Sequence, residues 1–257
     1  MQAFFIIVLM LLCIAAVLVI LKLNEKQKII ELFQYAAEGN SPRLIGFLKT
    51  NKRLVHARNR DGRTALLVAL ENGHGEAGLH LLKAGSDITF KENTGKTLIH
   101  FAALCNTPHL LDFLLSRGLD VNSQSFENIT PLHIAAMKGN AASAERLIET
   151  GAEVNAKDNI DETPLHKAVQ EGRIETAGLL LSRKAKVNAM NEKDPLPLLI
   201  ALTKGHEELA LLLIEKGADA NAVDNFSITP LELARKTGNV KIIELLKKHG
   251  AQEKEKS

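Results

Sequence analysis

Two glycine-rich stretches have the residue types that bind phosphate groups. Residues 73–78 read Gly-His-Gly-Glu-Ala-Gly, which fits the G-x-G-x-x-G pattern of dinucleotide-binding turns. Residues 95–97 read Gly-Lys-Thr, as at the end of a phosphate-binding loop, but Phe90 replaces the glycine that such a loop needs five residues upstream. The first stretch follows an apolar segment of helical character (66–71) and not a strand, so neither stretch predicts a nucleotide site.

Other residues could bind metal or transfer protons. Residues 206–208 read His-Glu-Glu, like the beginning of a zinc-protease helix, but Ala210 stands where the second histidine ligand would be. No Ser or Cys has an identifiable general base, and no metal-ligand cluster has a suitable spacing. The sequence therefore predicts no catalytic, metal or cofactor site and no small-molecule substrate, so the chain is not expected to be an enzyme.

Three histidines recur at a fixed spacing: His100, His133 and His166 are 33 residues apart. The same period governs a helix-opening motif in which Thr accepts a hydrogen bond at the N-cap and Pro starts the helix. A fixed period of this length predicts one small unit copied in tandem, each copy burying its apolar face against its neighbours. The openers stand at Thr64, Thr97, Thr130, Thr163, Leu196 and Thr229.

Helix ends recur with the same period. Nine residues after each opener stands a residue suited to the left-handed conformation that ends a helix. Asn106 takes this position once, and Lys184 replaces glycine once at the end of the second apolar run. The glycines are Gly73, Gly139, Gly172, Gly205 and Gly238 after the first run and Gly85, Gly118, Gly151, Gly217 and Gly250 after the second.

The fullest copy, residues 130–140, reads Thr-Pro-Leu-His-Ile-Ala-Ala-Met-Lys-Gly-Asn, and residues 163–168 read Thr-Pro-Leu-His-Lys-Ala. This pattern resembles the ankyrin repeat. The resemblance implies an all-α solenoid of helix-turn-helix units with β-hairpin finger loops, in which the histidine braces the turn through hydrogen bonds. It also implies a module that binds proteins through its fingers and the exposed side of its first helices.

The period predicts where each repeat begins and ends. A divergent unit, without the Thr-Pro opener, precedes the regular ones and acts as a cap. The fifth unit departs most from the pattern, with Asp194-Pro195 before Leu196, and predicts lower local stability unless this is ordinary drift. The expected parts are an anchor (1–23), a juxtamembrane segment with the capping repeat (24–60), and six repeats: 61–93, 94–126, 127–159, 160–192, 193–225 and 226–257, the last with a charged cap.

Residues Ala3 to Leu21 form an unbroken apolar run. As a helix rising about 1.5 Å per residue, the run approaches the roughly 30 Å thickness of a bilayer's hydrocarbon core, which predicts a transmembrane helix. Lys22, Lys26 and Lys28 follow the run, so the positive-inside rule predicts a single-pass membrane protein with its repeats facing the cytoplasm.

A cleaved signal peptide is the alternative interpretation of the same run. The best cleavage position follows Ala15, which would leave an apolar stub from Ala16 to Leu21, and no Lys or Arg precedes the run. Under this alternative the chain is an exported, periplasmic or secreted, binding protein.

Composition argues against nucleic acid as a partner. The formal net charge is +2, Trp is absent, and aromatic residues make up 4% of the chain. Lys and Arg alternate with Asp and Glu instead of forming a basic stripe with stacking aromatics. The two cysteines, Cys13 and Cys105, form no disulfide framework and fit a reducing compartment.

The variable positions of the repeats carry the candidate partner-binding residues. Apolar side chains at fingers and first helices predict a surface for a protein partner near the membrane, unless they pack against neighbouring fingers. We therefore expect a membrane-tethered scaffold, with the exported binding protein as the alternative. The candidates are Leu104, Phe126, Ile129, Met137, Ile160 and Phe226, with Arg60, Asp61, Arg63, Lys96, Glu162 and Lys193 as weaker ones.

Overall fold

The computed structural model describes residues 2–190 and 196–253, with side chains from Met10 onward. In this part of the chain there are fourteen α-helices, one 3-10 helix and no β-strand. The chain divides into two compact units, Met1–Asp87 and Ile88–Ser257, and each is described by itself. The helical solenoid expected from the sequence is therefore present.

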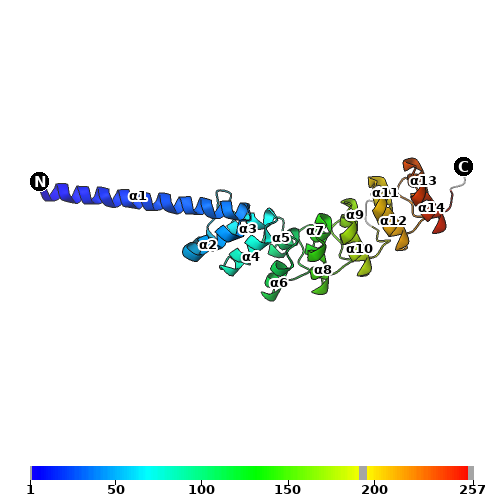
Figure 1. The fold of residues 1–257 in the computed structure, drawn as a ribbon, viewed down its shortest axis with the longest axis horizontal. Helices are drawn as coiled ribbons and strands as arrows, with labels where there is room; N and C mark the ends of the chain where they lie inside the picture. Colours follow the sequence, from blue (N-terminus) through cyan, green and yellow to red (C-terminus); the bar gives the residue numbers. More distant parts are fainter. Residues whose placement is uncertain (1, 191–195, 254–257) are drawn as a thin grey trace. The chain divides into compact units, whose positions relative to one another are not determined.

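The first unit contains four α-helices and the 3-10 helix. Helix α1 packs on α2 and α3, and α2 packs on α4 (Figure 1). Only the C-terminal end of α1 joins this core, through the buried side chains of Leu32 and Ala36. The elements are α1 (Gln2–Ala37), α2 (Ser41–Asn51), η1 (Lys52–His56), α3 (Ala65–Glu71) and α4 (Gly75–Lys83).

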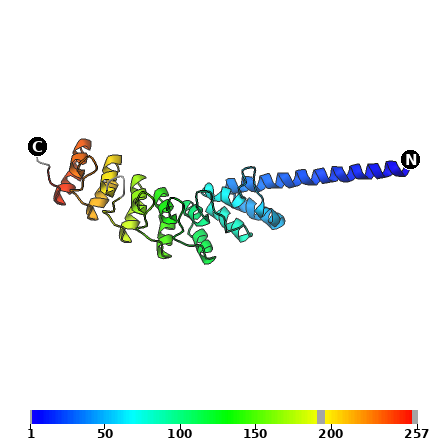
Figure 2. The same cartoon turned by 180° about the vertical axis from the view of Figure 1, so that it is seen from behind.

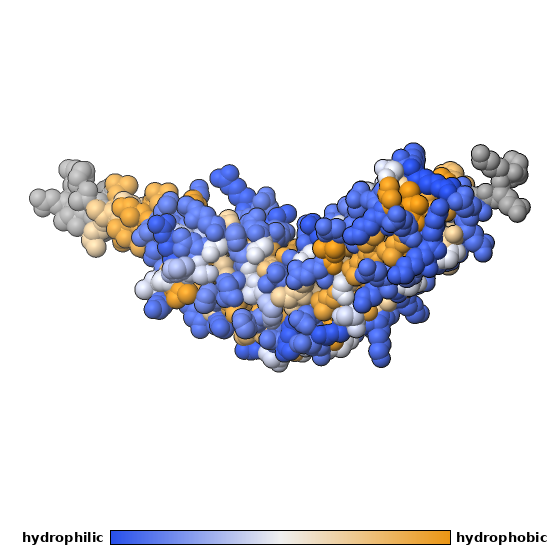
Figure 3. All heavy atoms as spheres, turned by 45° about the vertical axis from the view of Figure 1, so that its right-hand side comes forward, coloured by the Kyte–Doolittle hydropathy of each residue, from blue (hydrophilic) through white to orange (hydrophobic). Residues whose placement is uncertain are grey.

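Helix α1 corrects the prediction of a membrane anchor. It continues without a break across residue 23, where the sequence predicted the anchor to end. The described part of the apolar run, Met10 to Leu21, is exposed (Figure 3). The side chains of residues 3–9 lie outside the described part.

Among the described residues no helix combines the length and the apolar character that crossing a membrane requires. The predicted location, a single-pass membrane protein with repeats facing the cytoplasm, is therefore wrong. The physical reason is that the described part of α1 continues past Leu21 into charged residues, among them Lys22, Glu25 and Lys26.

The second unit stacks helix pairs in two rows. Within one row α5, α7, α9, α11 and α13 pack in succession, and within the other α6, α8, α10, α12 and α14 do (Figures 1 and 2). The helices are α5 (Leu98–Leu104), α6 (Pro108–Ser116), α7 (Pro131–Lys138), α8 (Ala141–Glu149), α9 (Pro164–Gln170), α10 (Ile174–Ser182), α11 (Pro197–Lys204), α12 (Glu207–Glu215), α13 (Pro230–Thr237) and α14 (Val240–Lys248).

The helices begin and end where their capping residues predict. Thr130 Oγ1 accepts a hydrogen bond from the His133 amide at 3.4 Å, and Pro131 is the first residue of α7. Gly139 ends α7 with a φ of 77°, and Asn106 takes the same left-handed conformation after α5 with a φ of 48°. These predictions are confirmed, because caps depend on residues close in sequence.

The fingers are tight turns and not the predicted β-hairpins. The described residues contain only two isolated bridges, Arg58 with Thr64 and Lys91 with Thr97. In the finger before α9, Asp158 Oδ1 accepts hydrogen bonds from the amides of Ile160 at 3.0 Å and Glu162 at 2.9 Å. These amides bond to a side chain, so no second rung of a strand ladder forms.

Asparagine side chains link successive helix pairs by hydrogen bonds to the backbone. Asn155 Nδ2 donates to the Lys184 carbonyl at 3.2 Å, while its Oδ1 accepts from the Lys186 amide at 2.8 Å. One amide group thereby satisfies a donor and an acceptor of the next unit. The same pair of bonds recurs at Asn122, Asn188 and Asn221.

Lys184 offers a test of the residues in left-handed conformation that end the helices. Its φ of 68° is strained for a residue with a Cβ, whereas Gly217 occupies the equivalent position with a φ of 86°. We expect Lys184→Gly to raise the free energy of unfolding by about 0.5–1 kcal/mol, because glycine removes this strain. The matched Gly217→Ala variant should lower it by a similar amount. Urea unfolding checks both, and a destabilised Lys184→Gly variant would contradict the explanation.

Candidate protein-binding groove

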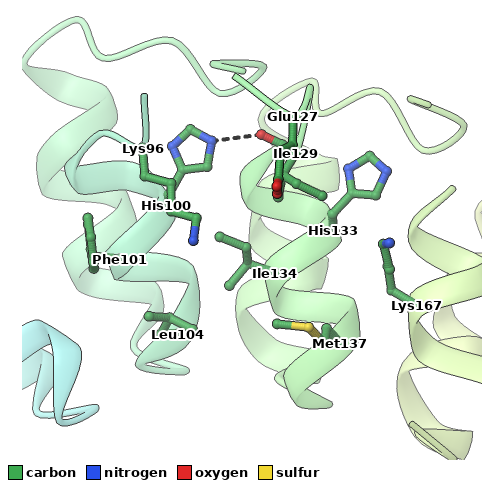
Figure 4. A pocket seen from close by; sticks show the side chains of 10 residues that line it. All are labelled: Lys96, His100, Phe101, Leu104, Glu127, Ile129, His133, Ile134, Met137 and Lys167. Carbon is green, nitrogen blue, oxygen red and sulfur yellow. Dashed lines mark hydrogen bonds between the residues drawn. The ribbon is translucent and has the colours of Figure 1, made fainter. Parts of the chain in front are cut away.

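A cavity of about 330 Å³ opens between the first helices α5 and α7 in the second unit. Its apolar lining comes from Phe101 and Leu104 on α5, Ile134 and Met137 on α7, and Ile129 on the finger before α7 (Figure 4). We call this cavity the groove. Its volume is at the lower end of the range for ligand pockets, which suits one or two apolar side chains.

The apolar floor of the groove is confined to two helices. Phe101 and Leu104 on α5 have the same places in the 33-residue period as Ile134 and Met137 on α7. On α9 these places hold Lys167 and Gln170 instead. The floor therefore ends at α9, where polar side chains replace apolar ones.

At α9 the polar side chains form a closed ion cluster. Lys167 Nζ lies 2.7 Å from Asp158 Oδ2 and also binds Glu162, whose other oxygen accepts from Gln170 Nε2. Both carboxylates are buried. Burial raises the pKa of Asp158, but hydrogen bonds from Lys167 and the backbone outweigh this and hold it below its ordinary value. The single ammonium of Lys167 is thus held between two carboxylates and is not a free positive charge.

Histidines hold the fingers that border the groove. His100 Nδ1 accepts a hydrogen bond from the Thr97 amide at 3.1 Å, and His100 Nε2 bonds to the Ile129 carbonyl at 2.9 Å (Figure 4). Because an amide can only donate, Nδ1 is unprotonated and Nε2 carries the hydrogen. The position of Ile129 is therefore set by a side chain of the preceding helix pair.

The next histidine repeats this arrangement. His133 accepts from the Thr130 amide at 3.2 Å and bonds to the Glu162 carbonyl at 3.0 Å. For His166 the carbonyl at the equivalent place belongs to residue 195, outside the described residues. At His100 and His133 the backbone occupies both ring nitrogens, so neither imidazole is available to move a proton for a bound molecule.

Burial keeps these imidazoles neutral. It lowers the pKa of His133 to about 4, against smaller raising effects of the Glu162 carbonyl and Asp158, while Lys167 lowers it further. It also lowers the pKa of His100, and the nearby Lys96 charge acts in the same direction.

Cys105 is also chemically quiet. Burial raises the pKa of its thiol to about 12, so it remains protonated at neutral pH and is a poor nucleophile. Among residues 10–190 and 196–253 no group of three or more His, Cys, Asp or Glu side chains could hold a metal ion.

Two charged residues border the groove on the finger side. Lys96, which directly precedes the N-cap Thr97, is half-buried, and Glu127 is exposed. Figure 4 shows the Lys96 ammonium and the Glu127 carboxylate both directed toward the space between α5 and α7. Within the described part of the chain neither forms an ion pair.

The structure thus brings together four of the residues that the sequence singled out: Leu104, Ile129, Met137 and Lys96 all line the groove. Phe126 is 67% exposed on the finger before α7, where its ring lies against Gly95 and 5.6 Å from the Lys91 ammonium. Its amide donates to the Thr94 carbonyl at 2.9 Å, which joins two neighbouring fingers.

The other sequence candidates lie outside the groove lining. Phe226 is 81% exposed on the finger before α13, and Ile160 is half-buried on the finger before α9. Glu162 is buried in the ion cluster. Arg60, Asp61 and Arg63 belong to the first unit, where Arg63 pairs with Glu71 at 2.7 Å, and Lys193 lies outside the described residues.

The sequence reasoning missed Phe101, Ile134, Glu127 and Lys167 as groove residues. A signal was available, because comparing equivalent places of the period shows large apolar residues at 101 and 134 and a lysine at 167. What could not be read from the sequence is that these places point into a shared cavity.

The histidine bridges predict a pH dependence of stability. The pKa of His133 falls from its ordinary 6.5 to about 4 on folding, so between these values the unfolded chain binds more protons than the folded one. The contribution of the neutral His133 to the free energy of unfolding is complete above pH 6.5 and is lost as the pH falls toward 4. At 1.36 kcal/mol per pKa unit, we expect this histidine alone to account for about 3 kcal/mol of that loss.

Chemical unfolding between pH 7 and pH 4 measures this effect. His133→Leu should flatten the pH profile relative to the unmodified chain and should also lower stability at pH 7, because the Thr130 amide and Glu162 carbonyl lose a partner. The control His109→Gln changes an exposed histidine of α6 and should leave the profile unchanged. An unaltered pH profile in His133→Leu would show that the bridge does not depend on the neutral ring.

Comparisons with known proteins agree with this architecture. A family model described as "Ankyrin repeats (3 copies)" matches three stretches of the chain, residues 32–125, 99–191 and 179–257. Together these stretches cover most of the sequence, including the groove.

Similar curated proteins include the NAD-capped RNA hydrolase NUDT12 of Macaca fascicularis, of Pongo abelii and of Homo sapiens. Each is 32% identical over 94 residues, which is 36% of this chain and 20% of the relative. The chain thus spans about a fifth of the length of these relatives. The family match and the stacked helix pairs together show that the chain belongs to the ankyrin repeat family, whose repeats are non-catalytic and indicate a scaffold for protein partners.

Proposed function

We propose that this chain is a non-catalytic binding scaffold that captures a protein partner in the groove between α5 and α7. The observation that carries the proposal is an apolar cavity of about 330 Å³ on the surface of the second unit, bordered by charged residues. A cavity with apolar walls and a few polar groups at its rim is the usual form of a binding site. The partner places an apolar side chain between Leu104 and Met137.

The groove is formed before the partner arrives. Its finger wall, Ile129, is held by the His100 bridge, and α5 packs directly on α7. A site that is already ordered loses less conformational entropy on binding. Leu104 and Met137 are half-buried, and the flexible thioether of Met137 adapts to different apolar shapes.

Phe126 provides a second contact beside the groove. The fingers that it joins are the ones that carry Lys96 and Ile129, and most of its ring is exposed. A large exposed aromatic ring next to an apolar cavity is typical of a binding hot spot. Ile160 and Phe226, on later fingers, are proposed outer contacts, with Arg60, Asp61, Arg63, Glu162 and Lys193 as weaker ones.

We propose further that the repeats follow the 33-residue period. The stacked helix pairs support boundaries at residues 61, 94, 127, 160, 193 and 226, after a capping unit in residues 24–60. With these boundaries the groove lies across the second and third repeats. An insertion at a boundary would therefore separate Leu104 from Met137.

The groove can be tested by substituting residues that the chain itself carries at equivalent positions of other helices. Gln170 occupies on α9 the place of Leu104 and Met137, so Leu104→Gln with Met137→Gln replaces the floor by a residue this position already accepts. We expect the double variant to bind its partner at least tenfold more weakly, because a buried apolar contact becomes polar. The measurement is quantitative co-purification with the tagged chain, followed by mass spectrometry.

The control variant is Met190→Ser, which removes an exposed methionine outside the groove. It should retain every partner that the unmodified chain retains, and thermal unfolding should show both variants to be folded. A folded groove variant that keeps all partners of the unmodified chain would refute the proposal.

A further inference from the structure

We propose that the groove selects a partner segment carrying an acidic side chain, which pairs with Lys96 beside the apolar side chain held between α5 and α7. This inference rests on the proposed function and adds the chemistry of the partner to it. The evidence is that Lys96, which borders the apolar floor of the groove, forms no ion pair within the described part of the chain.

The charged residues at the equivalent finger position elsewhere have ion-pair partners within the chain. Arg63 and Glu162 have the same place in the period as Lys96, and each contacts the residue eight positions later on its first helix. Arg63 pairs with Glu71 at 2.7 Å, while Glu162 accepts from Gln170 and pairs with Lys167. At the groove the residue eight positions after Lys96 is Leu104, which cannot pair with a cation.

The surroundings of Lys96 make its charge effective. The side chain is half-buried, so water screens it less than it screens an exposed lysine. The imidazole of His100 beside it is neutral, because burial and the Lys96 charge itself lower its pKa. A carboxylate brought to Lys96 therefore meets a cation without an internal partner.

The neighbouring charges fix where that carboxylate can lie. Glu127, on the exposed rim, repels a second carboxylate, and Lys167 is already matched by Asp158 and Glu162. An acidic side chain is thus favoured at one end of the groove only. Charge complementarity of this kind sets the direction and register of a bound segment more than its total affinity.

A polypeptide segment fits the groove better than a free small acid. The floor residues Phe101, Leu104, Ile134 and Met137 offer no side-chain hydrogen bond to orient a small polar molecule. An extended segment supplies both an apolar side chain for this floor and, one or two residues away, an acidic one for Lys96. Its backbone would lie along the fingers.

Peptide display on the immobilised full chain tests the inference. The unmodified chain should enrich peptides with a large apolar residue and an Asp or Glu at a fixed spacing from it. On Lys96→Glu the acidic preference should be lost and a Lys or Arg should take its place. Lys138→Glu, a charge reversal at an exposed position of α7 outside the groove lining, should keep the acidic preference.

Synthetic peptides make the test quantitative. A selected acidic peptide should bind Lys96→Glu at least tenfold more weakly than the unmodified chain. Replacing its Asp by Asn should weaken binding to the unmodified chain by a similar factor and leave binding to Lys96→Glu nearly unchanged. This non-additivity is the sign of a direct pair.

The failures of the two proposals are distinguishable. Apolar peptides without an acidic preference, bound equally by the unmodified chain and Lys96→Glu but lost from Met137→Gln, would overturn the acidic pairing and leave the groove as a binding site. If no enriched peptide responds to Met137→Gln, the groove does not bind polypeptide segments, and both proposals fall.

Discussion

The part of the second unit that carries the groove depends on two neutral imidazoles, each of which joins a helix start to the next finger. His100 accepts from the Thr97 amide and bonds to a carbonyl 29 residues later, and His133 does the same one repeat on. One ring therefore satisfies a free amide at a helix N-terminus and a loop carbonyl together. Because both groups belong to the backbone, the bridge fixes the fingers whatever side chains they carry.

Other backbone bridges extend this frame along the unit. Asn155 ties its finger base to the unit that follows, and Asn140 donates to the Ala103 and Leu104 carbonyls at 2.9 and 2.8 Å, at the end of α5. With the backbone held in this way, side chains on the exposed positions are free to differ. The same frame carries an apolar groove at α5 and α7 and a buried ion cluster at α9.

The sequence predicted the features that depend on neighbouring residues. The start of α7 after Thr130 and its end at Gly139 follow from local caps, and the left-handed Asn106 follows from the period. The finger conformation was predicted wrongly, because the resemblance suggested a hairpin whereas Asp158 captures the amides of the turn. An Asp at the start of a turn is itself a sequence signal for this Asx-turn hydrogen bonding.

Helix α1 and the groove show where the sequence is insufficient. The apolar run and the capping unit look like separate segments in the sequence, yet a single helix connects them, since no residue between them ends a helix. The sequence identifies four groove residues as candidates, but it does not show that they converge, because this depends on the stacking of neighbouring helix pairs. These residues are Leu104, Ile129, Met137 and Lys96. Phe101 and Ile134 were overlooked because their places in the period are also those of ordinary buried residues.

The apolar exposure at the groove is not imposed by the fold. Ala102 and Ala135, on the two helices that form the groove, are fully buried, and α5 packs directly on α7. On α9 the chain fills the same positions with Lys167 and Gln170, which both bind Glu162. Paired polar side chains could therefore occupy these positions on α5 and α7 as well, and leaving apolar side chains exposed to water there opposes folding. An apolar cavity retained at that cost, on a frame rigid enough to hold its shape, is what a binding site requires and what a purely structural repeat does not.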